Sequence, residues 1–388
     1  MSFTLDIFTL LKILAVLQGI IFTVLLIRRA WVQERYSDYW LAGLLFVFSC
    51  YLLRYFMDDI DPNSDNNIIN RLLTFSYYII GVVIYFYLKC QLNAHYRLSR
   101  KDLWHFLPVL IYMGLFFFNT FQLYQHGGSW ERPLFYTVML WLFVAYRSIG
   151  TCVYWFLSWR LYQKYLLWLP TERSDTEGVK FKWFKNILII LAIMVFSGIA
   201  LNLFDNFIFT TPRWIDVGQG LLVAFGIYYL SLMGYLQYQP QQLIYIEPTN
   251  NVEEKEEKEE KEETNTSSLL MSKMPQNEIE EWKNKILTLI DQERLYLNPE
   301  LTLTDFAQRL HTHSKLISAV INEAFEKNFN DFINEYRVNL FKEKVNDPKL
   351  KHLTLLAIAF ECGFNSKSTF NRAVKRATGE MPSTFLQN

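Results

Sequence analysis

Seven apolar windows follow one another through residues 1–239, and no other feature limits the fold as strongly. Each can form a helix of about 20 residues, the length needed to cross the hydrocarbon core of a membrane. The windows lie near 6–27, 39–57, 68–88, 103–121, 134–159, 186–208 and 215–236. One buried core helix can imitate such a window, but seven in succession leave no polar face for a soluble fold. The sequence therefore predicts an all-α fold that begins with a seven-helix transmembrane bundle.

Basic residues in the loops predict how this bundle is oriented, because Lys and Arg accumulate on the cytoplasmic side. The loops after the first, third and fifth windows carry thirteen of them: Arg28, Arg29, Arg35, Lys89, Arg97, Arg100, Lys101, Arg160, Lys164, Arg173, Lys180, Lys182 and Lys185. The loops after the second, fourth and sixth windows carry three, namely Arg71, Arg132 and Arg213. We therefore expect the N-terminus outside and everything after Gln237 in the cytoplasm.

Four charged residues lie inside the windows, where charge is costly and often functional. We expect Lys12 to reach the outer membrane surface by snorkelling. Arg54 and Asp205 lie near the outer ends of their windows, so an ion pair is favoured over ligand contact. Arg147 lies near mid-depth and requires hydroxyls, carbonyls, water or an anionic ligand. The last three are candidates for a structural polar site or for binding the signal, whose identity the sequence does not reveal.

After Gln239 the composition changes to that of a soluble protein. Residues 240–276 are predicted to form a flexible linker that contains the acidic run EEKEEKEEKEE at 253–263. A sharper hypothesis is that this run competes with DNA for a basic surface. The predicted domains are thus a sensor at 1–239, the linker at 240–276 and a DNA-binding domain at 277–388. The formal net charge is zero, so any attraction to nucleic acid must be local.

No catalytic, metal or cofactor site is predicted. Cys50, Cys90, Cys152 and Cys362 lack the spacing of a disulfide framework or a metal clip. His311 and His313 have no cysteine or acidic partner at ligand spacing, so we expect them to serve as caps and phosphate contacts.

The C-terminal part contains two short helix pairs. An amphipathic helix with Ile279, Trp282, Ile286, Leu289 and Ile290 comes first. In the segment LTLTDFAQRLHTHSKLISAVINEAF, a helix capped by Thr302 or Thr304 breaks at 311–313 and restarts at Ser314. This is the outline of a helix-turn-helix. Its polar candidates for contacting DNA are Lys315, Ser318 and Asn322.

The second pair lies in HLTLLAIAFECGFNSKSTFNRAVKRATG, where Thr354 can cap, Ala359 permits close packing and Gly363 permits the turn. Its following helix, 366–378, turns Phe370, Ala373 and Val374 inward. The candidates for contacts with phosphates and base edges are Lys367, Ser368, Thr369, Asn371, Arg372, Lys375 and Arg376. Between the pairs, NFNDFINEYRVNLFKEKV predicts a helix of about 17 residues. It could set two reading helices near one turn of DNA apart, about 34 Å.

These motifs resemble the DNA-binding domain of the AraC/XylS family of bacterial transcription regulators over roughly 301–385. The family pattern corresponds to LTLTDFAQRLHTH and to LTLLAIAFECGFNSKSTFNRAVKRATGEMPSTF. The positions in register are Gly363, Phe364, Ser368, Phe370, Arg372, Lys375, Arg376, Gly379 and Pro382. Ala319 and Asn322 stand where the family usually has basic residues, so we expect the first unit mainly to position the second.

The resemblance implies a bacterial regulator that binds promoter DNA. Joined to seven spans, it is similar to membrane-bound sensor regulators, which would place this multi-pass chain in the cytoplasmic (inner) membrane. We predict a non-enzymatic protein that couples a sensed signal to promoter binding. The alternative is a transporter or membrane enzyme with a regulatory DNA- or protein-binding tail. Candidate partners are double-stranded DNA, membrane lipid, RNA polymerase, a second copy and an unidentified small-molecule or membrane signal. The operator and the sign of regulation stay open, as does proteolytic release of the tail.

Overall fold

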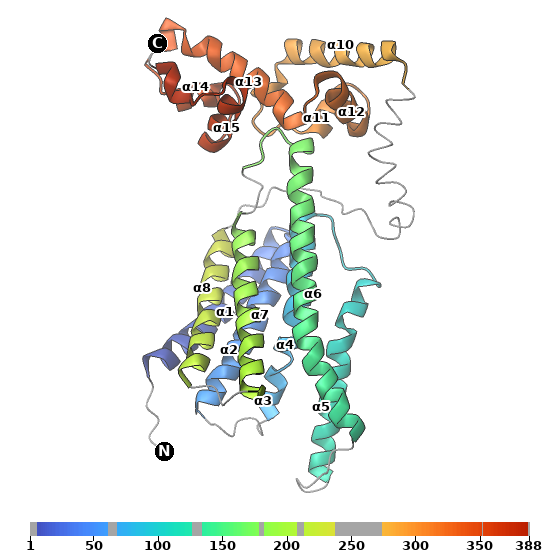
Figure 1. Ribbon diagram of the computed structural model, residues 1–388, viewed down its shortest axis with the longest axis vertical. Helices are drawn as coiled ribbons and strands as arrows, with labels where there is room; N and C mark the ends of the chain where they lie inside the picture. Colours follow the sequence, from blue (N-terminus) through green and yellow to red (C-terminus); the bar gives the residue numbers. More distant parts are fainter. Residues whose placement is uncertain are drawn as a thin grey trace. The chain divides into compact units, whose positions relative to one another are not determined.

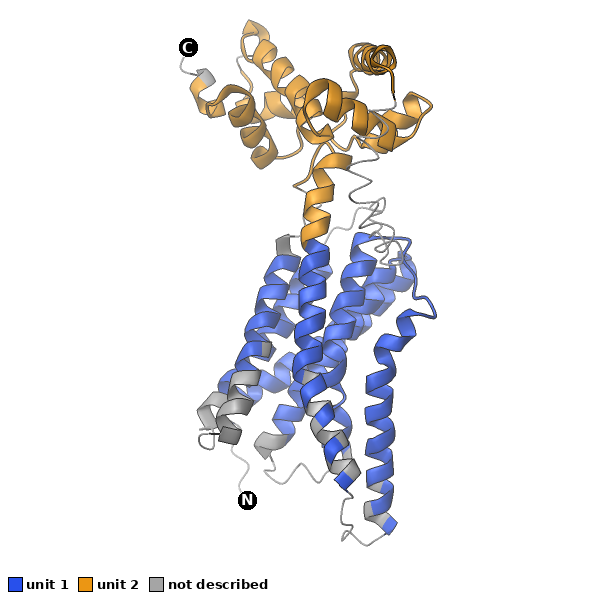
Figure 2. Cartoon of the chain, turned by 45° about the vertical axis from the view of Figure 1, so that its right-hand side comes forward, with its two compact units in different colours: residues 1–162, 182–246 blue, residues 163–181, 247–388 orange. Residues whose placement is uncertain are grey.

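The computed structural model describes residues 6–60, 68–125, 134–177, 182–207, 213–236, 274–350 and 352–386. These residues are helical without a β-strand, which confirms the all-α class. They form two compact units, unit 1 with residues 1–162 and 182–246, and unit 2 with residues 163–181 and 247–388 (Figure 2). Sequence reasoning assigned 163–181 to the N-terminal domain, whereas the structure groups it with the C-terminal unit. The acidic run at 253–263 lies outside the described residues.

Each predicted window of unit 1 corresponds to helical structure (Figure 1). The helices are α1 (Ile7–Val32), α2 (Tyr36–Ile60), α3 (Ile68–Leu73), α4 (Ser76–Leu92), η2 (Asp102–Phe106), α5 (Leu107–Gln125), α6 (Leu134–Glu172), α7 (Lys182–Phe207) and α8 (Arg213–Leu236). Four described helices are long and apolar enough to cross a membrane, namely Ile7–Val32, Tyr36–Met57, Asp102–Asn119 and Val217–Leu236. Tyr78–Leu92 and Phe184–Gly198 are shorter apolar helices. Length and composition thus support four of the seven predicted crossings.

The third window, predicted as one helix, is divided into α3 and α4. The hydroxyl of Ser76 donates a 2.8 Å hydrogen bond to the carbonyl of Leu73 at this break. The side chain thereby satisfies a carbonyl group at the end of α3, so the chain can interrupt the helix within an apolar stretch.

Helix α1 packs against α2 and α8, and its small residues face these neighbours. Ala15, Gly19 and Thr23 are on the inward side, whereas Leu17, Ile21 and Val24 are exposed. Burial of small residues and exposure of large apolar ones is the reverse of the pattern in a soluble bundle.

Lys12 does not snorkel as expected, because its side chain is only 1% exposed within unit 1. It fills space beside Gly220 of α8, where a Cβ atom would lie 2.6 Å from Lys12 Cε. A side chain at position 220 would therefore displace the lysine.

Arg29, one of the basic residues from which the orientation of the bundle was predicted, joins three helices. Its Nε donates to Asp38 Oδ2 of α2 at 2.6 Å, and its Nη2 donates to the Gly234 carbonyl of α8 at 3.1 Å. The Asp38 side chain is 2% exposed, so this ion pair is largely shielded from water. Part of the basic charge on which the predicted orientation rests therefore stabilises the packing of α1, α2 and α8.

Unit 2 contains α10 (Gln276–Glu293), η3 (Leu295–Leu297), α11 (Leu303–Arg309), α12 (Ser314–Phe325), α13 (Phe329–Val345), η4 (Pro348–Leu350), α14 (Leu355–Glu361), α15 (Lys367–Thr378) and η5 (Pro382–Leu386). Helix α13 has 17 residues, as predicted, and contributes to two hydrophobic cores. Phe332 and Ile333 pack in the core that includes α10, α11 and α12. Val338 and Phe341 pack with α14 and α15. Helix α13 therefore packs against both short helix pairs.

Candidate nucleic-acid interface

The first helix-turn-helix unit consists of α11 and α12. Thr302 caps α11, since its hydroxyl accepts a 3.1 Å hydrogen bond from Asp305 N, and the Asp305 carboxylate accepts one from Thr302 N at 3.0 Å. This reciprocal capping box confirms Thr302 of the two predicted caps. His311 occupies the left-handed region of the turn with φ +51°. His313 occupies the N-cap position of α12, as expected, but its ring makes no capping hydrogen bond.

The second unit consists of α14 and α15, and its turn depends on a glycine. Thr354 caps α14 by accepting a 3.2 Å hydrogen bond from Ala357 N, as predicted. Gly363 has φ +92°, a conformation that residues with a Cβ rarely adopt. A Cβ at this position would also lie 2.3 Å from the Tyr296 carbonyl oxygen. Both the backbone angle and the close approach of another main chain therefore require glycine at the predicted turn.

Helix α15 is fixed at both ends and along its buried side. Ser366 caps its start by accepting from Thr369 N at 3.2 Å, and Gly379 ends it with φ +79°. The Phe370 ring packs edge-on against Phe341 of α13, with centroids 4.8 Å apart. The amphipathic pattern that the sequence predicted for this helix is thereby confirmed at Phe370 and Val374, which are buried.

The opposite side of α15 presents a basic surface. The exposed residues there are Lys367, Ser368, Arg372, Lys375 and Arg376. Ser368, Arg372 and Lys375 recur at intervals of three and four positions, so they form one stripe along the helix. Such a stripe of cationic and hydroxyl side chains has the chemistry needed to contact phosphates and base edges.

Two of the predicted contact residues of α15 differ from this stripe. Thr369 is 1% exposed, and its hydroxyl donates a 2.7 Å hydrogen bond to Asp175 Oδ1. Asn371 is half-buried at the edge of the stripe. Helical register explains Thr369, because a position one residue from Ser368 turns toward the body of unit 2.

In α12 the predicted polar residues share one surface. Lys315 and Asn322 are exposed and Ser318 is half-exposed, at spacings of three and four residues. Ala319 is 3% exposed and lies in the hydrophobic core. The side chain of Ala319 therefore points inward and adds nothing to this surface, and the smaller contribution of the first unit to DNA binding stays a prediction.

Arg337 of α13 is the polar centre of unit 2, and sequence analysis did not identify it. Its side chain is 0% exposed. The Nε atom donates to Tyr296 O at 2.7 Å, and the Nη2 atom donates to Asn298 O at 2.7 Å. Its Nη1 atom also donates to Asn334 Oδ1 at 3.2 Å. Burial lowers the pKa of the guanidinium to about 10, so the group stays protonated at neutral pH.

A sequence signal for Arg337 does exist. Ile333, Arg337 and Phe341 are spaced four residues apart, so the arginine falls on the apolar stripe of a predicted helix. An arginine in such a stripe is buried only where several acceptors surround it. Asn334 is an acceptor within α13, but the other acceptors are Tyr296, Asn298 and Ser174, and the sequence of α13 does not indicate them.

The predicted membrane site is described only in part. Arg54 lies on α2 and is half-buried. Arg147 and Asp205 belong to α6 and α7, but their side chains lie outside the described residues. The expected Arg54–Asp205 ion pair therefore stays a prediction.

Comparison with known proteins agrees with this geometry. Residues 306–388 match the family described as "Helix-turn-helix domain". No curated protein and no solved structure matched the chain. The chain thus carries an AraC-type helix-turn-helix domain at 306–388, a range that begins within α11 and includes α12, α14 and α15.

Proposed function

We propose that this chain is a membrane-bound transcription regulator, in which unit 1 senses a signal and unit 2 binds promoter DNA. The observation that carries the proposal is the exposed basic stripe of α15 within a helix-turn-helix domain. In such domains the second helix enters the major groove and its polar side chains reach base edges. Unit 1 would then place this activity at a membrane, in agreement with its apolar helices.

The membrane part of the proposal includes seven crossings with the N-terminus outside a bacterial inner membrane. Four candidate spans support it by length and hydropathy. The outward large apolar residues of α1 support it as well, because lipid is the solvent in which such a surface is stable. The basic residues of alternate loops supply the direction. Arg54, Arg147 and Asp205 remain the candidates for a structural or signal-binding polar site.

The two reading helices contribute unequally in this proposal. Helix α15 supplies the cationic contacts through Lys367, Arg372, Lys375 and Arg376. Helix α12 adds Lys315, Ser318 and Asn322, which reach a neighbouring segment of the groove about one helical turn away. Lipid surrounds unit 1, and RNA polymerase and a second copy of the chain are further partners that fit a promoter-bound regulator.

The test is the salt dependence of DNA binding by the full chain in detergent micelles. The probe is a mixed-sequence duplex of about 30 bp, long enough for two sites one helical turn apart. The variant Arg372→Ala/Lys375→Ala/Arg376→Ala removes three cations from α15. We expect at least about tenfold weaker binding and a slope of log affinity against log salt that is flatter by about two to three.

A matched control removes cations elsewhere in unit 2. Lys283→Ala/Lys285→Ala acts on α10, where both lysines pair with glutamates of the same helix. This control should bind almost as tightly as the wild type. Equal binding by the triple variant and the wild type would contradict the assignment of α15 as the reading helix.

A further inference from the structure

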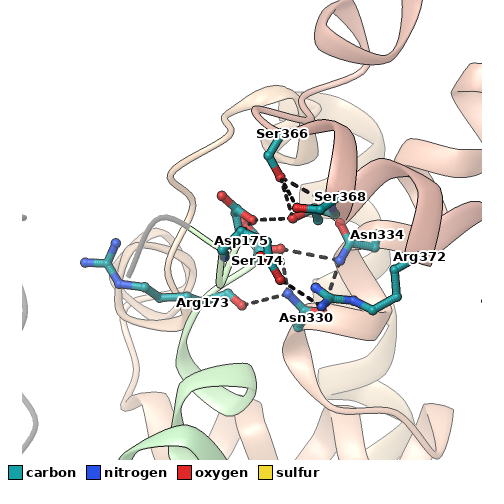
Figure 3. Close-up of polar contacts among 10 residues, drawn as sticks. Arg173, Ser174, Asp175, Asn330, Asn334, Ser366, Ser368 and Arg372 are labelled. Carbon is teal, nitrogen blue, oxygen red and sulfur yellow. Dashed lines mark hydrogen bonds and ion pairs between the residues drawn. The ribbon is translucent and has the colours of Figure 1, made fainter. Parts of the chain in front are cut away.

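A five-residue segment, Arg173–Glu177, belongs to unit 2 although it lies between α6 and α7 in the chain. Ser174 N donates to Leu301 O at 3.1 Å, next to an antiparallel bridge between Arg173 and Thr302. Ser174 and Thr176 are buried. The segment is therefore seated in unit 2 through its main chain and is not a loose loop. We call it the docked segment (Figure 3).

The side chains that hold the docked segment come from α13. Asn330 Nδ2 donates to Ser174 O at 2.7 Å and to Arg173 O at 3.2 Å. Arg337 Nη2 donates to Ser174 Oγ at 3.0 Å. Figure 3 shows Asn330 and Asn334 gathered at Ser174. The amide of Asn330 lies within hydrogen-bond distance of the main-chain carbonyls of Arg173 and Ser174, and the guanidinium of Arg337 lies beside Ser174. Helix α13 therefore provides a specific binding site for this segment.

The carboxylates of the docked segment contact the reading helix. Asp175 Oδ1 accepts a 2.7 Å hydrogen bond from Thr369 Oγ1 at the start of α15. Glu177 Oε1 accepts a 3.0 Å hydrogen bond from Arg372 Nη1. The Glu177 side chain is 11% exposed and that of Arg372 is 48% exposed. Glu177 thus forms an ion pair with Arg372, a cation of the basic stripe.

This geometry opposes DNA binding for two reasons. A guanidinium that is paired with Glu177 must exchange that carboxylate for a phosphate, and the exchange lowers the gain from binding. Two carboxylates beside the stripe also repel the phosphates that approach it, and a partly buried site screens this repulsion less than open solvent does. DNA and the docked segment therefore compete for side chains in the same part of α15.

We propose that the docked segment is an internal competitor of DNA, so that its docking and DNA binding weaken each other. The inference rests on the proposed function, because it assigns a regulator to the same reading helix. The segment follows α6 directly, and the last residues of α6 belong to unit 2 from Gln163 on. A signal that changes α6 or α7 therefore has a covalent route to the reading helix.

The experiment measures binding of the about 30-bp mixed-sequence duplex by the full chain in micelles. Asp175→Asn/Glu177→Gln removes the two charges and keeps side-chain size. We expect about five- to tenfold tighter binding and a salt slope steeper by about one. The control Glu278→Gln/Glu300→Gln removes two exposed carboxylates elsewhere in unit 2 and should change affinity less than twofold.

A double-mutant cycle tests whether the gain in DNA affinity depends on the contact between Glu177 and Arg372. In a chain that carries Arg372→Ala, the further change Glu177→Gln should increase affinity much less, because its ion-pair partner is absent and only the repulsion of phosphates is relieved. A gain of equal size in both backgrounds would overturn the proposal, and so would a gain in the Glu278/Glu300 control. Unchanged or weaker binding by the Asp175/Glu177 variant would identify the segment as a structural support instead, and would also overturn it.

A second readout uses the wild-type chain. The peptide bond after Arg173 is a trypsin site, and the docked state shields it because Ser174 is 0% exposed. By reciprocity, duplex DNA should shift the docking equilibrium toward the undocked state, so saturating DNA should accelerate cleavage after Arg173. An unchanged cleavage rate would overturn the competition while leaving DNA binding itself intact. If no version of the chain bound the duplex, the proposed function would fail, and this inference with it.

Discussion

Replacing Arg337 with methionine tests whether one buried guanidinium holds unit 2 together. Methionine keeps much of the length and volume but donates no hydrogen bond. The two shortest bonds of Arg337, both 2.7 Å, go to the main-chain carbonyls of Tyr296 and Asn298. Main-chain oxygens cannot rotate toward new partners as the hydroxyl of Ser174 can. The loss of stability should therefore come mainly from the loss of these two hydrogen bonds.

The magnitude follows from the strength of charge-assisted hydrogen bonds in a buried site. Each contributes about 1.5–3 kcal/mol, so the two bonds together contribute at least about 3 kcal/mol. We expect unit 2 to lose about that much local stability. Since about 1.4 kcal/mol corresponds to a factor of ten, amide protection should fall by about a hundredfold to a few thousandfold.

Hydrogen exchange of the full chain in micelles measures this change by peptide. The peptides that cover η3, α14 and α15 should exchange faster, while those of unit 1 should not change. Arg309→Met is the control, because this arginine is 56% exposed and pairs with Glu293 at the surface. It should alter exchange by less than about fivefold. If Arg337→Met had no larger effect than Arg309→Met, the central role of Arg337 would be refuted.

Two further predictions concern the second helix-turn-helix unit. Gly363→Ala should destabilise α14 and α15 by at least about 2 kcal/mol more than Gly379→Ala, as measured by hydrogen exchange. Both glycines have a positive φ, but the space around the Cβ position of Gly379 is open, whereas a Cβ at Gly363 meets the Tyr296 carbonyl. Equal losses of stability would contradict the close approach of Tyr296 to Gly363. Burial raises the pKa of the Cys362 thiol to about 11, so its alkylation at pH 8, followed by peptide mass spectrometry, should be at least about a hundredfold slower than that of an exposed thiol. Rapid labelling of Cys362 would show that the core of this unit opens readily.

Local chemistry made much of the fold predictable. The apolar windows predicted helices in unit 1, and Thr302, Thr354 and Gly363 marked where helices of unit 2 begin or turn. Caps and glycine turns depend on residues within three or four positions, so the sequence around them carries the full signal. The same holds for the 17-residue helix α13, whose apolar and polar positions repeat at helical spacing.

Long-range partners were not predictable in the same way. The bond between Asp175 and Thr369 joins residues 194 positions apart, and no periodicity relates them. Arg337 required acceptors from residue 174 and from η3, which a single-helix pattern does not contain. Acidic competition with DNA was considered for 253–263, which lies outside the described residues, whereas the carboxylates of 173–177, in a predicted cytoplasmic loop, contact α15.

Errors of register explain the remaining differences at the site. Thr369 was counted among the contact residues, yet it lies one residue away from the exposed Ser368 and turns inward. A helix turns by about 100° per residue, so a polar type alone does not decide which surface a side chain joins. Lys12 was misjudged for a related reason, since only the position of Gly220 on another helix creates the space that it fills.

The central claim, that a DNA-binding regulator works from a membrane, is tested most directly by recovering DNA with the membrane fraction of cells. Cells that produce the full chain are crosslinked, their membranes are isolated, and the bound DNA is sequenced. We predict a small set of promoter fragments that are enriched with the wild type and lost with the Arg372/Lys375/Arg376 alanine variant. A chain found in the membrane without enriched DNA, or bound to DNA only outside the membrane fraction, would contradict the account.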